Sequence, residues 1–153
     1  MRSSSGRGQT AIEMLLILGI MLAGLAVVIA SVPSSSSDTT LVYAMRNVGA
    51  DVCSYLQTGV VVNDTLHAPL NDLIARSNYS SVPCRFLGVS FVKSTSGYNV
   101  TLTFDYSGPL GTAFASDVGQ FVVLKASQYD GFGLSNGTLL FHGSPVRVEV
   151  VVK

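Results

Sequence analysis

The chain has 153 residues, with nine basic and nine acidic side chains and a formal net charge of zero. Charged residues make up only 12% of it and form no basic stripe, so it lacks the electrostatic footprint of a nucleic-acid-binding protein. Hydrophobic residues make up 48%, and a single long apolar run argues against a multi-pass transporter or channel.

The apolar run extends from Met14 to Val32, carries no charge and has Ser31 as its only polar residue. About 20 apolar residues span the hydrocarbon core of a bilayer, so the length of the run fits a membrane helix. The run is apolar on every helical face and therefore needs lipid or other helices on all sides. Gly19 and Ala23 form a small-xxx-small step, which allows two helices to approach closely.

Two ordinary roles for this run stay open. In a secretory signal peptide, Arg2 and Arg7 would form the positive region and residues 28–30 a small-residue cleavage site. In a single-pass anchor, the same arginines would hold the N-terminus in the cytoplasm. The run is longer than the usual apolar region of a signal peptide, about 7–15 residues. Neither role uses Gly8 or the carboxylate of Glu13.

The segment from Arg7 to Leu16, RGQTAIEMLL, favours a third role. It resembles the class III signal of archaeal type IV pilin-like proteins, in which a prepilin peptidase cuts between the glycine and the glutamine. The resemblance implies a cut between Gly8 and Gln9 and retention of the hydrophobic helix in the mature protein. Glu13 matches the family's carboxylate, four residues beyond the new N-terminus. The resemblance is confined to this segment and the apolar run.

Glu13 is costly at the head of an apolar helix, because a carboxylate inside a membrane segment costs about 2.5–3.5 kcal/mol on insertion scales. Cleavage would expose the α-amino group of Gln9, which is mostly protonated at neutral pH. We expect Glu13 to pair with this group on a neighbouring subunit, which would favour helices in the correct register. Two other interpretations stay open: a first-turn acid stabilised by the helix dipole, and an i,i+4 pair with Gln9 within one chain.

Residues 33–38 interrupt the apolar pattern and predict a hinge, because Pro33 disfavours helix and four serines follow it. Asp38, Thr39 or Thr40 can cap a new helix. Apolar residues then recur at helical spacing and predict an amphipathic helix over 39–57, ended by Gly59. These apolar residues are Leu41, Ala44, Met45, Val48, Val52, Tyr55 and Leu56.

The remainder of the chain is predicted to form mostly strands. Apolar and polar residues alternate over 98–106 and 146–152, which indicates strands with one buried face. Further strand candidates are 86–93, 120–126 and 138–142; residues 94–97 predict a hairpin turn, 128–136 a loop and 69–76 a short helix.

The predicted fold class is therefore α+β: a long N-terminal hydrophobic helix, kinked or broken near Pro33, plus a C-terminal antiparallel β-rich globular domain packed on the 39–57 helix. The predicted organisation is a cleaved leader (1–8), a hydrophobic transmembrane or filament-core helix (9–32), a hinge (33–38) and an extracellular domain (39–153).

Two kinds of modification are predicted in the outer domain. Four asparagines stand in N-x-[ST] acceptor triplets and are candidate glycosylation sites: Asn63, Asn78, Asn99 and Asn136. Cys53 and Cys84 are the only cysteines, and an even pair in an extracellular domain suggests a disulfide, although two separate thiols remain the alternative.

No enzyme is expected. The sequence contains no phosphate-binding loop, no His-Glu-x-x-His motif and no glycine-flanked serine. His67 and His142 do not combine with two cysteines into a convincing zinc set, so we expect no metal, no cofactor and no catalytic residue.

The resemblance implies a structural subunit of an archaeal type IV pilus-like surface filament that polymerises through its N-terminal helix, with a role in adhesion. It implies insertion of a precursor into the cytoplasmic membrane, and then assembly at the cell surface. The implied partners are identical subunits in a helical homopolymer, the prepilin peptidase, an assembly ATPase and a platform protein, without nucleic acid. The alternative is a single-pass membrane-anchored extracellular binding domain, or a minor pilin that does not form the filament body.

Overall fold

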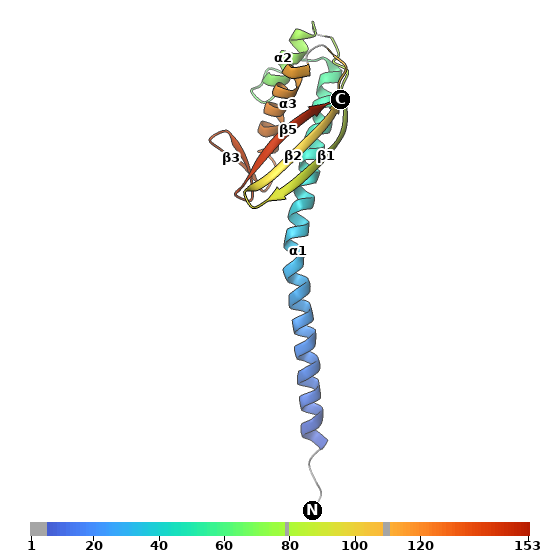
Figure 1. Ribbon diagram of the computed structural model, residues 1–153, viewed down its shortest axis with the longest axis vertical. Helices are drawn as coiled ribbons and strands as arrows, with labels where there is room; N and C mark the ends of the chain where they lie inside the picture. The colour runs from blue at the N-terminus through green and yellow to red at the C-terminus, as the bar shows by residue number, and fades with distance from the viewer. Residues whose placement is uncertain (1–5, 79, 109–110) are drawn as a thin grey trace, which may run out of the picture. The chain divides into compact units, whose positions relative to one another are not determined.

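A computed structural model of the chain describes residues 6–78, 80–108 and 111–153 (Figure 1). Within its first helix, the side chains of residues 13–23 and 37–58 are described. The elements in chain order are α1 (Gly6–Thr58), α2 (Ala68–Arg76), β1 (Arg85–Ser94), β2 (Gly97–Asp105), α3 (Gly111–Ala126), β3 (Phe132–Ser135), β4 (Thr138–Phe141) and β5 (Ser144–Val152). The chain divides into two compact units, Met1–Thr39 and Thr40–Lys153.

The predicted break near Pro33 is wrong, because α1 is one helix from Gly6 to Thr58. Proline removes one backbone donor and costs about 3 kcal/mol in a helix interior. A break would leave several carbonyl groups without intrahelical partners and would require a second helix nucleation. Helical patterns on both sides of residues 33–38 favour continuation. The helix ends where Gly59 adopts a positive φ of 64°, in agreement with the predicted stop.

The predicted hydrophobic membrane helix also requires correction. Among the residues with described side chains, no helix combines the length and the apolar character that crossing a membrane requires.

The sheet of the second unit is mixed, so the prediction of an antiparallel sheet is wrong. Its strand order is β1-β2-β5-β4-β3, and β2 pairs with β5 in parallel while the other pairs are antiparallel. The reason lies between β2 and β5, where α3 and the β3–β4 hairpin intervene. A crossover of this length can return the chain in the same direction, whereas a short turn cannot.

The predicted strand over 120–126 is wrong, because these residues belong to α3. Seen alone, Gln120–Ala126 is a short apolar run, which does not distinguish a buried strand from a buried helix. The helical spacing becomes clear only over a longer window, in which the buried residues of α3 are Phe114, Val118, Phe121, Val122 and Ala126. The domain is consequently less β-rich than predicted, and residues 128–136, predicted as a loop, contain β3.

The other predicted strands are confirmed. Residues 86–93 fall in β1, residues 98–105 of the alternating segment fall in β2, and 138–142 and 146–152 correspond to β4 and β5. Residues 69–76 form the predicted short helix, α2.

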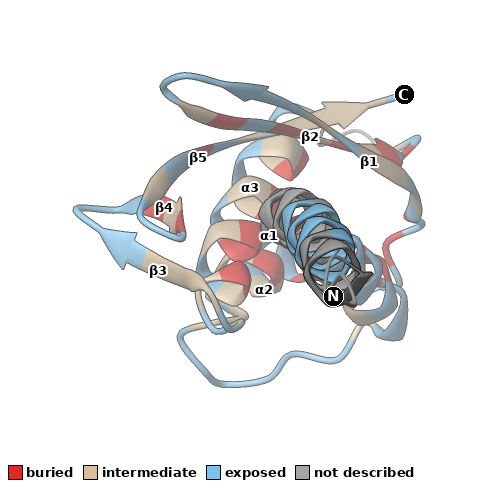
Figure 2. Ribbon diagram, turned by 90° about the horizontal axis from the view of Figure 1, so that it is seen from below, coloured by how far each residue is buried: buried red, intermediate tan, exposed pale blue. Residues whose placement is uncertain are grey.

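The core lies between one face of the sheet and the helices, as Figure 2 shows for β1, β2 and β5. From β2, Tyr98, Val100, Leu102 and Phe104 point into this core, and the residues between them face the other way. The C-terminal part of α1 contributes a buried stripe, Leu41, Ala44, Met45, Val48, Val52 and Leu56. In Figure 2, no described element covers the opposite face of β1, β2 and β5. Asn99 and Arg147, which are exposed register partners, belong to this face.

Candidate functional site

The N-terminal part of α1 presents large apolar side chains to solvent. Eight of them are between 55% and 75% exposed: Met14, Leu15, Leu16, Ile17, Leu18, Ile20, Met21 and Leu22. They occupy every face of the helix, so no single face can be buried against one partner while the others remain in water. Exposed apolar surface of this kind marks an interaction site. We call residues 13–23 the apolar segment.

Glu13 begins the apolar segment and is exposed. The backbone of Gly8 and Gln9 lies in the first turns of α1, which begins at Gly6, and their side chains lie outside the described ones. Cleavage between these two residues would therefore require the start of the helix to fray, as helix ends commonly do. The i,i+4 spacing of Gln9 and Glu13 is retained on this continuous helix.

Gly19 lies in the middle of the apolar segment and has open space around it. A Cβ atom added there would meet no heavy atom within 4 Å. Gly19 and Ala23 are four residues apart on one helical face, where the absence of bulk leaves room for the backbone of another helix. The predicted small-xxx-small step is thus accessible to a partner.

The two cysteines are joined in a disulfide that links α1 to the segment preceding β1. Their Cα atoms are 5.1 Å apart, and both side chains are buried, with Cys53 6% and Cys84 4% exposed. The side-chain amide of Gln57 donates to the Cys84 carbonyl oxygen at 2.6 Å, at the same junction. The bond therefore fixes the C-terminal part of α1 to the edge of the sheet.

All four predicted glycosylation asparagines are exposed: Asn63, Asn78, Asn99 and Asn136. Asn78 and Asn136 have positive φ angles of 58° and 50°, which asparagine tolerates in turns. Asn63 lies between α1 and α2, and Asn136 in the turn between β3 and β4. Asn99 lies on the open face of β2. The second residue of the Asn78 triplet lies outside the described residues.

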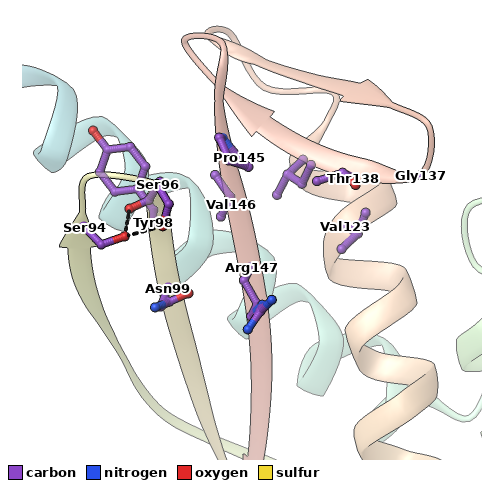
Figure 3. A pocket seen from close by; sticks show the side chains of 12 residues that line it. Ser94, Ser96, Tyr98, Asn99, Val123, Gly137, Thr138, Pro145, Val146 and Arg147 are labelled. Atoms are coloured by element: carbon purple, nitrogen blue, oxygen red, sulfur yellow. Dashed lines mark hydrogen bonds between the residues drawn. The ribbon is translucent and has the colours of Figure 1, made fainter.

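A cleft of about 530 Å³ lies where the β1–β2 turn, the start of β5 and the β3–β4 hairpin meet (Figure 3). Its polar lining consists of the side chains of Ser94, Ser96, Asn99, Thr138 and Arg147. Asn99 of β2 and Arg147 of β5 are register partners in the parallel pair, and both are exposed. We call this the polar cleft. Asn99 is a predicted glycosylation site, whereas no sequence motif singles out Arg147, because only the strand register brings the two together.

Close backbone contact shapes this cleft. Gly97, which opens β2, has a φ of +136°, and a Cβ atom there would lie 2.1 Å from the carbonyl oxygen of Pro145. Only glycine allows the β1–β2 turn to approach the start of β5 so closely. The side-chain oxygens of Ser94 and Ser96 are 3.0 Å apart at the same turn.

His67 and Asp64 form a pair that stabilises the turn before α2. The backbone N–H of His67 donates to Asp64 Oδ1 at 2.7 Å, and this hydrogen bond holds the pKa of the Asp64 carboxyl below its usual range. The His67 ring stacks on Tyr55 and packs against Phe121, with ring centroids 4.6 and 5.5 Å apart. No described hydroxyl or thiol forms a hydrogen bond with His67, so the pair has no nucleophile to activate.

Two other groups have shifted pKa values. Burial raises the pKa of the Asp117 carboxyl, and Arg76, at 4.0 Å, opposes that rise only in part. Burial, with the nearby Asp51 carboxylate, raises the pKa of the Tyr129 hydroxyl. Neither lies in the polar cleft or the apolar segment. Among the described residues, no group of three or more metal-ligating side chains comes together.

Comparison of the chain with models of protein families, with curated proteins and with solved structures finds no match.

Proposed function

We propose that the protein is the structural subunit of a surface filament of the archaeal type IV pilus kind, and that it polymerises through the N-terminal part of α1. The apolar segment carries this proposal. A side chain such as leucine stabilises a complex by about 1.5–3 kcal/mol when it moves from water into full apolar contact. The apolar segment holds eight such side chains, each more than half exposed.

Identical copies can surround this helix on all sides, which a single partner on one face cannot do. Gly19 and Ala23 supply the close approach that helix–helix packing requires. Glu13 supplies the register, because a carboxylate at the edge of an apolar bundle is costly and is stabilised where a positive group of a neighbour meets it. The α-amino group of Gln9, exposed by cleavage after Gly8, is that group in the proposed filament.

The test combines mass spectrometry with electron microscopy of cell-surface material from a host that carries an archaeal prepilin peptidase and pilus assembly system. We expect a mature N-terminus at Gln9 and filaments composed of this chain. Glu13→Gln is expected to leave cleavage unchanged and to abolish or strongly reduce filaments. The matched control is Glu149→Gln, the same substitution at an exposed position on β5.

Two results would contradict the proposal. If Glu13→Gln formed normal filaments, the carboxylate of Glu13 would not be needed for assembly. If the wild-type chain were cleaved correctly but stayed as single molecules, the proposed polymerisation would be wrong. That result would favour a separate binding domain or a minor subunit.

A further inference from the structure

The polar cleft contains hydrogen-bonding groups that no described residue satisfies. Within the described residues, Arg147 forms no ion pair and the Asn99 side chain makes no hydrogen bond. The Thr138 hydroxyl is likewise uncommitted, whereas Ser94 bonds to Ser96 and to the Gly97 carbonyl oxygen. The cleft therefore offers a guanidinium, a primary amide and hydroxyl groups to a ligand.

These groups face the same space. Asn99 and Arg147 are paired in register on adjacent parallel strands, which lie about 4.8 Å apart, and both belong to the open face of the sheet. Figure 3 shows their side chains next to each other, with Ser94 and Ser96 at the β1–β2 turn and Thr138 on the β3–β4 hairpin. One ligand of moderate size can contact all of them, since the cleft volume of about 530 Å³ falls in the range of small-molecule sites.

We propose that the polar cleft binds a saccharide that carries a carboxylate, such as a uronic acid unit. The planar guanidinium of Arg147 matches a carboxylate in a two-bond fork. The Asn99 amide and the hydroxyls of Ser96 and Thr138 are suited to sugar hydroxyl groups, because each can donate and accept. Pro145, which also lines the cleft and is exposed, provides apolar contact for the C–H face of a sugar ring.

The charges select this class of ligand. A nucleic acid or another polyanion gains its affinity from several cations, and Arg147 is the one cationic side chain among the described residues that line the cleft. Glu149 lies two residues farther along the same face of β5 and forms no ion pair with Arg147. Its negative charge disfavours ligands with more than one carboxylate. A single carboxylate among several hydroxyls fits best.

The saccharide can come from two sources. It can be a free or cell-surface saccharide. It can also be a glycan on this chain, because Asn99 stands in an acceptor triplet and lines the cleft. Both sources present the same chemistry to Arg147. The proposal does not depend on filament formation.

The test uses the full-length chain, made in a host without N-glycosylation and kept in a polyoxyethylene detergent, which contains no sugar. Binding of a glucuronic-acid-containing disaccharide is measured by titration calorimetry or NMR. We expect Arg147→Gln to weaken binding about tenfold or more, as loss of a charge-assisted hydrogen bond predicts. Arg85→Gln, at an exposed arginine on β1, is the matched control and should bind as the wild type does.

A second measurement needs no variant. The methyl ester of the same disaccharide keeps the hydroxyls and loses the charge, so the wild-type chain should bind it at least about tenfold more weakly. Equal binding of the acid and the ester, unchanged binding by Arg147→Gln, or no binding of the acid would each overturn the proposal.

The source of the saccharide is tested with glycosylated chain. Thr101→Val removes the acceptor triplet of Asn99 and keeps the Asn99 side chain, and Thr101 does not line the cleft. If the glycan on Asn99 fills the cleft, the glycosylated wild type should bind the free disaccharide about tenfold more weakly than Thr101→Val. If the ligand is external, the two should bind alike. This comparison assigns the source of the saccharide, and Arg147→Gln and the methyl ester test its carboxylate.

Discussion

The length of the loop that the Cys53–Cys84 disulfide closes predicts how much the bond stabilises the protein. The bond closes a loop with a sequence separation of 31. In the chain-entropy model, a loop of this length removes about 12 cal/mol/K from the unfolded chain, or about 3.7 kcal/mol at 25 °C. For a unit the size of Thr40–Lys153, the unfolding entropy near the midpoint is about 0.24 kcal/mol/K, so reduction should lower the Tm by about 15 °C.

The assay compares the oxidised and reduced wild-type chain by near-ultraviolet circular dichroism during heating, with and without a phosphine reductant. Reduction keeps every side chain, so it avoids the cavity that a substitution at these buried positions would create. A Cys53→Ala, Cys84→Ala double variant should lose more, because it adds the cavity cost to the entropy cost. A Tm difference of only a degree or two between oxidised and reduced protein would refute the loop-entropy reasoning.

Three further predictions concern single positions in the second unit. Gly97→Ala should lower stability by about 1–3 kcal/mol, because its Cβ atom would overlap the Pro145 carbonyl oxygen; a thermal melt measures this, and an unchanged Tm would show that the turn can move aside. Phe104→Ala should cost about 3–5 kcal/mol in urea unfolding, because Phe104 is fully buried against Phe86 and Phe114, and a loss below about 1 kcal/mol would contradict this packing. Burial raises the pKa of Asp117 in the folded state above its value in the unfolded state. Between these two pKa values the folded state binds more protons than the unfolded state, so the free energy of unfolding falls as pH rises from the unfolded-state pKa to the folded-state pKa. Asp117→Asn should therefore be more stable than the wild type at pH 7, with the difference shrinking as the pH falls toward 3.8, which Tm measurements across this range would test.

The parts of the fold that the sequence predicts are those with a clean local pattern. The alternation from Tyr98 to Tyr106 fixes which side chains of β2 are buried, and the structure buries the same set. The apolar spacing from Leu41 to Leu56 likewise marks the buried stripe of α1. In both cases the information needed lies within one element, because a strand repeats every two residues and a helix about every 3.6.

The wrongly predicted strand over 120–126 and the wrongly predicted antiparallel sheet are connected. Phe121 to Ala126 looks like a strand because β-branched and aromatic residues dominate it, and the packing of α3 overrides that preference. Once these residues are taken as a strand, nothing separates β2 from the last strands except hairpins, and an antiparallel sheet follows. Recognition of the helix would have shown a strand–helix–strand order, which favours a parallel pair such as β2 with β5.

The polar cleft could not be predicted, because it depends on register. Asn99 and Arg147 are far apart in the sequence, and alternation assigns each to a polar face without placing one beside the other. Sliding β5 by two residues along β2 would keep the same face and put Glu149 beside Asn99, which replaces a guanidinium with a carboxylate. The chemistry of the cleft is thus set by the packing that fixes β5, in which Val146 is buried in the core and Val148 and Val150 pack against it.

The two proposed activities reside in different units, and this makes them separable. The apolar segment belongs to Met1–Thr39 and the polar cleft to Thr40–Lys153. Glu13→Gln should therefore abolish filaments while the detergent-dispersed chain still binds the disaccharide with unchanged affinity. Arg147→Gln should form normal filaments that bind the disaccharide about tenfold more weakly. If Glu13→Gln also lost saccharide binding in detergent, the substitution in one unit would affect the other, and the assignment of the two activities to separate units would be wrong.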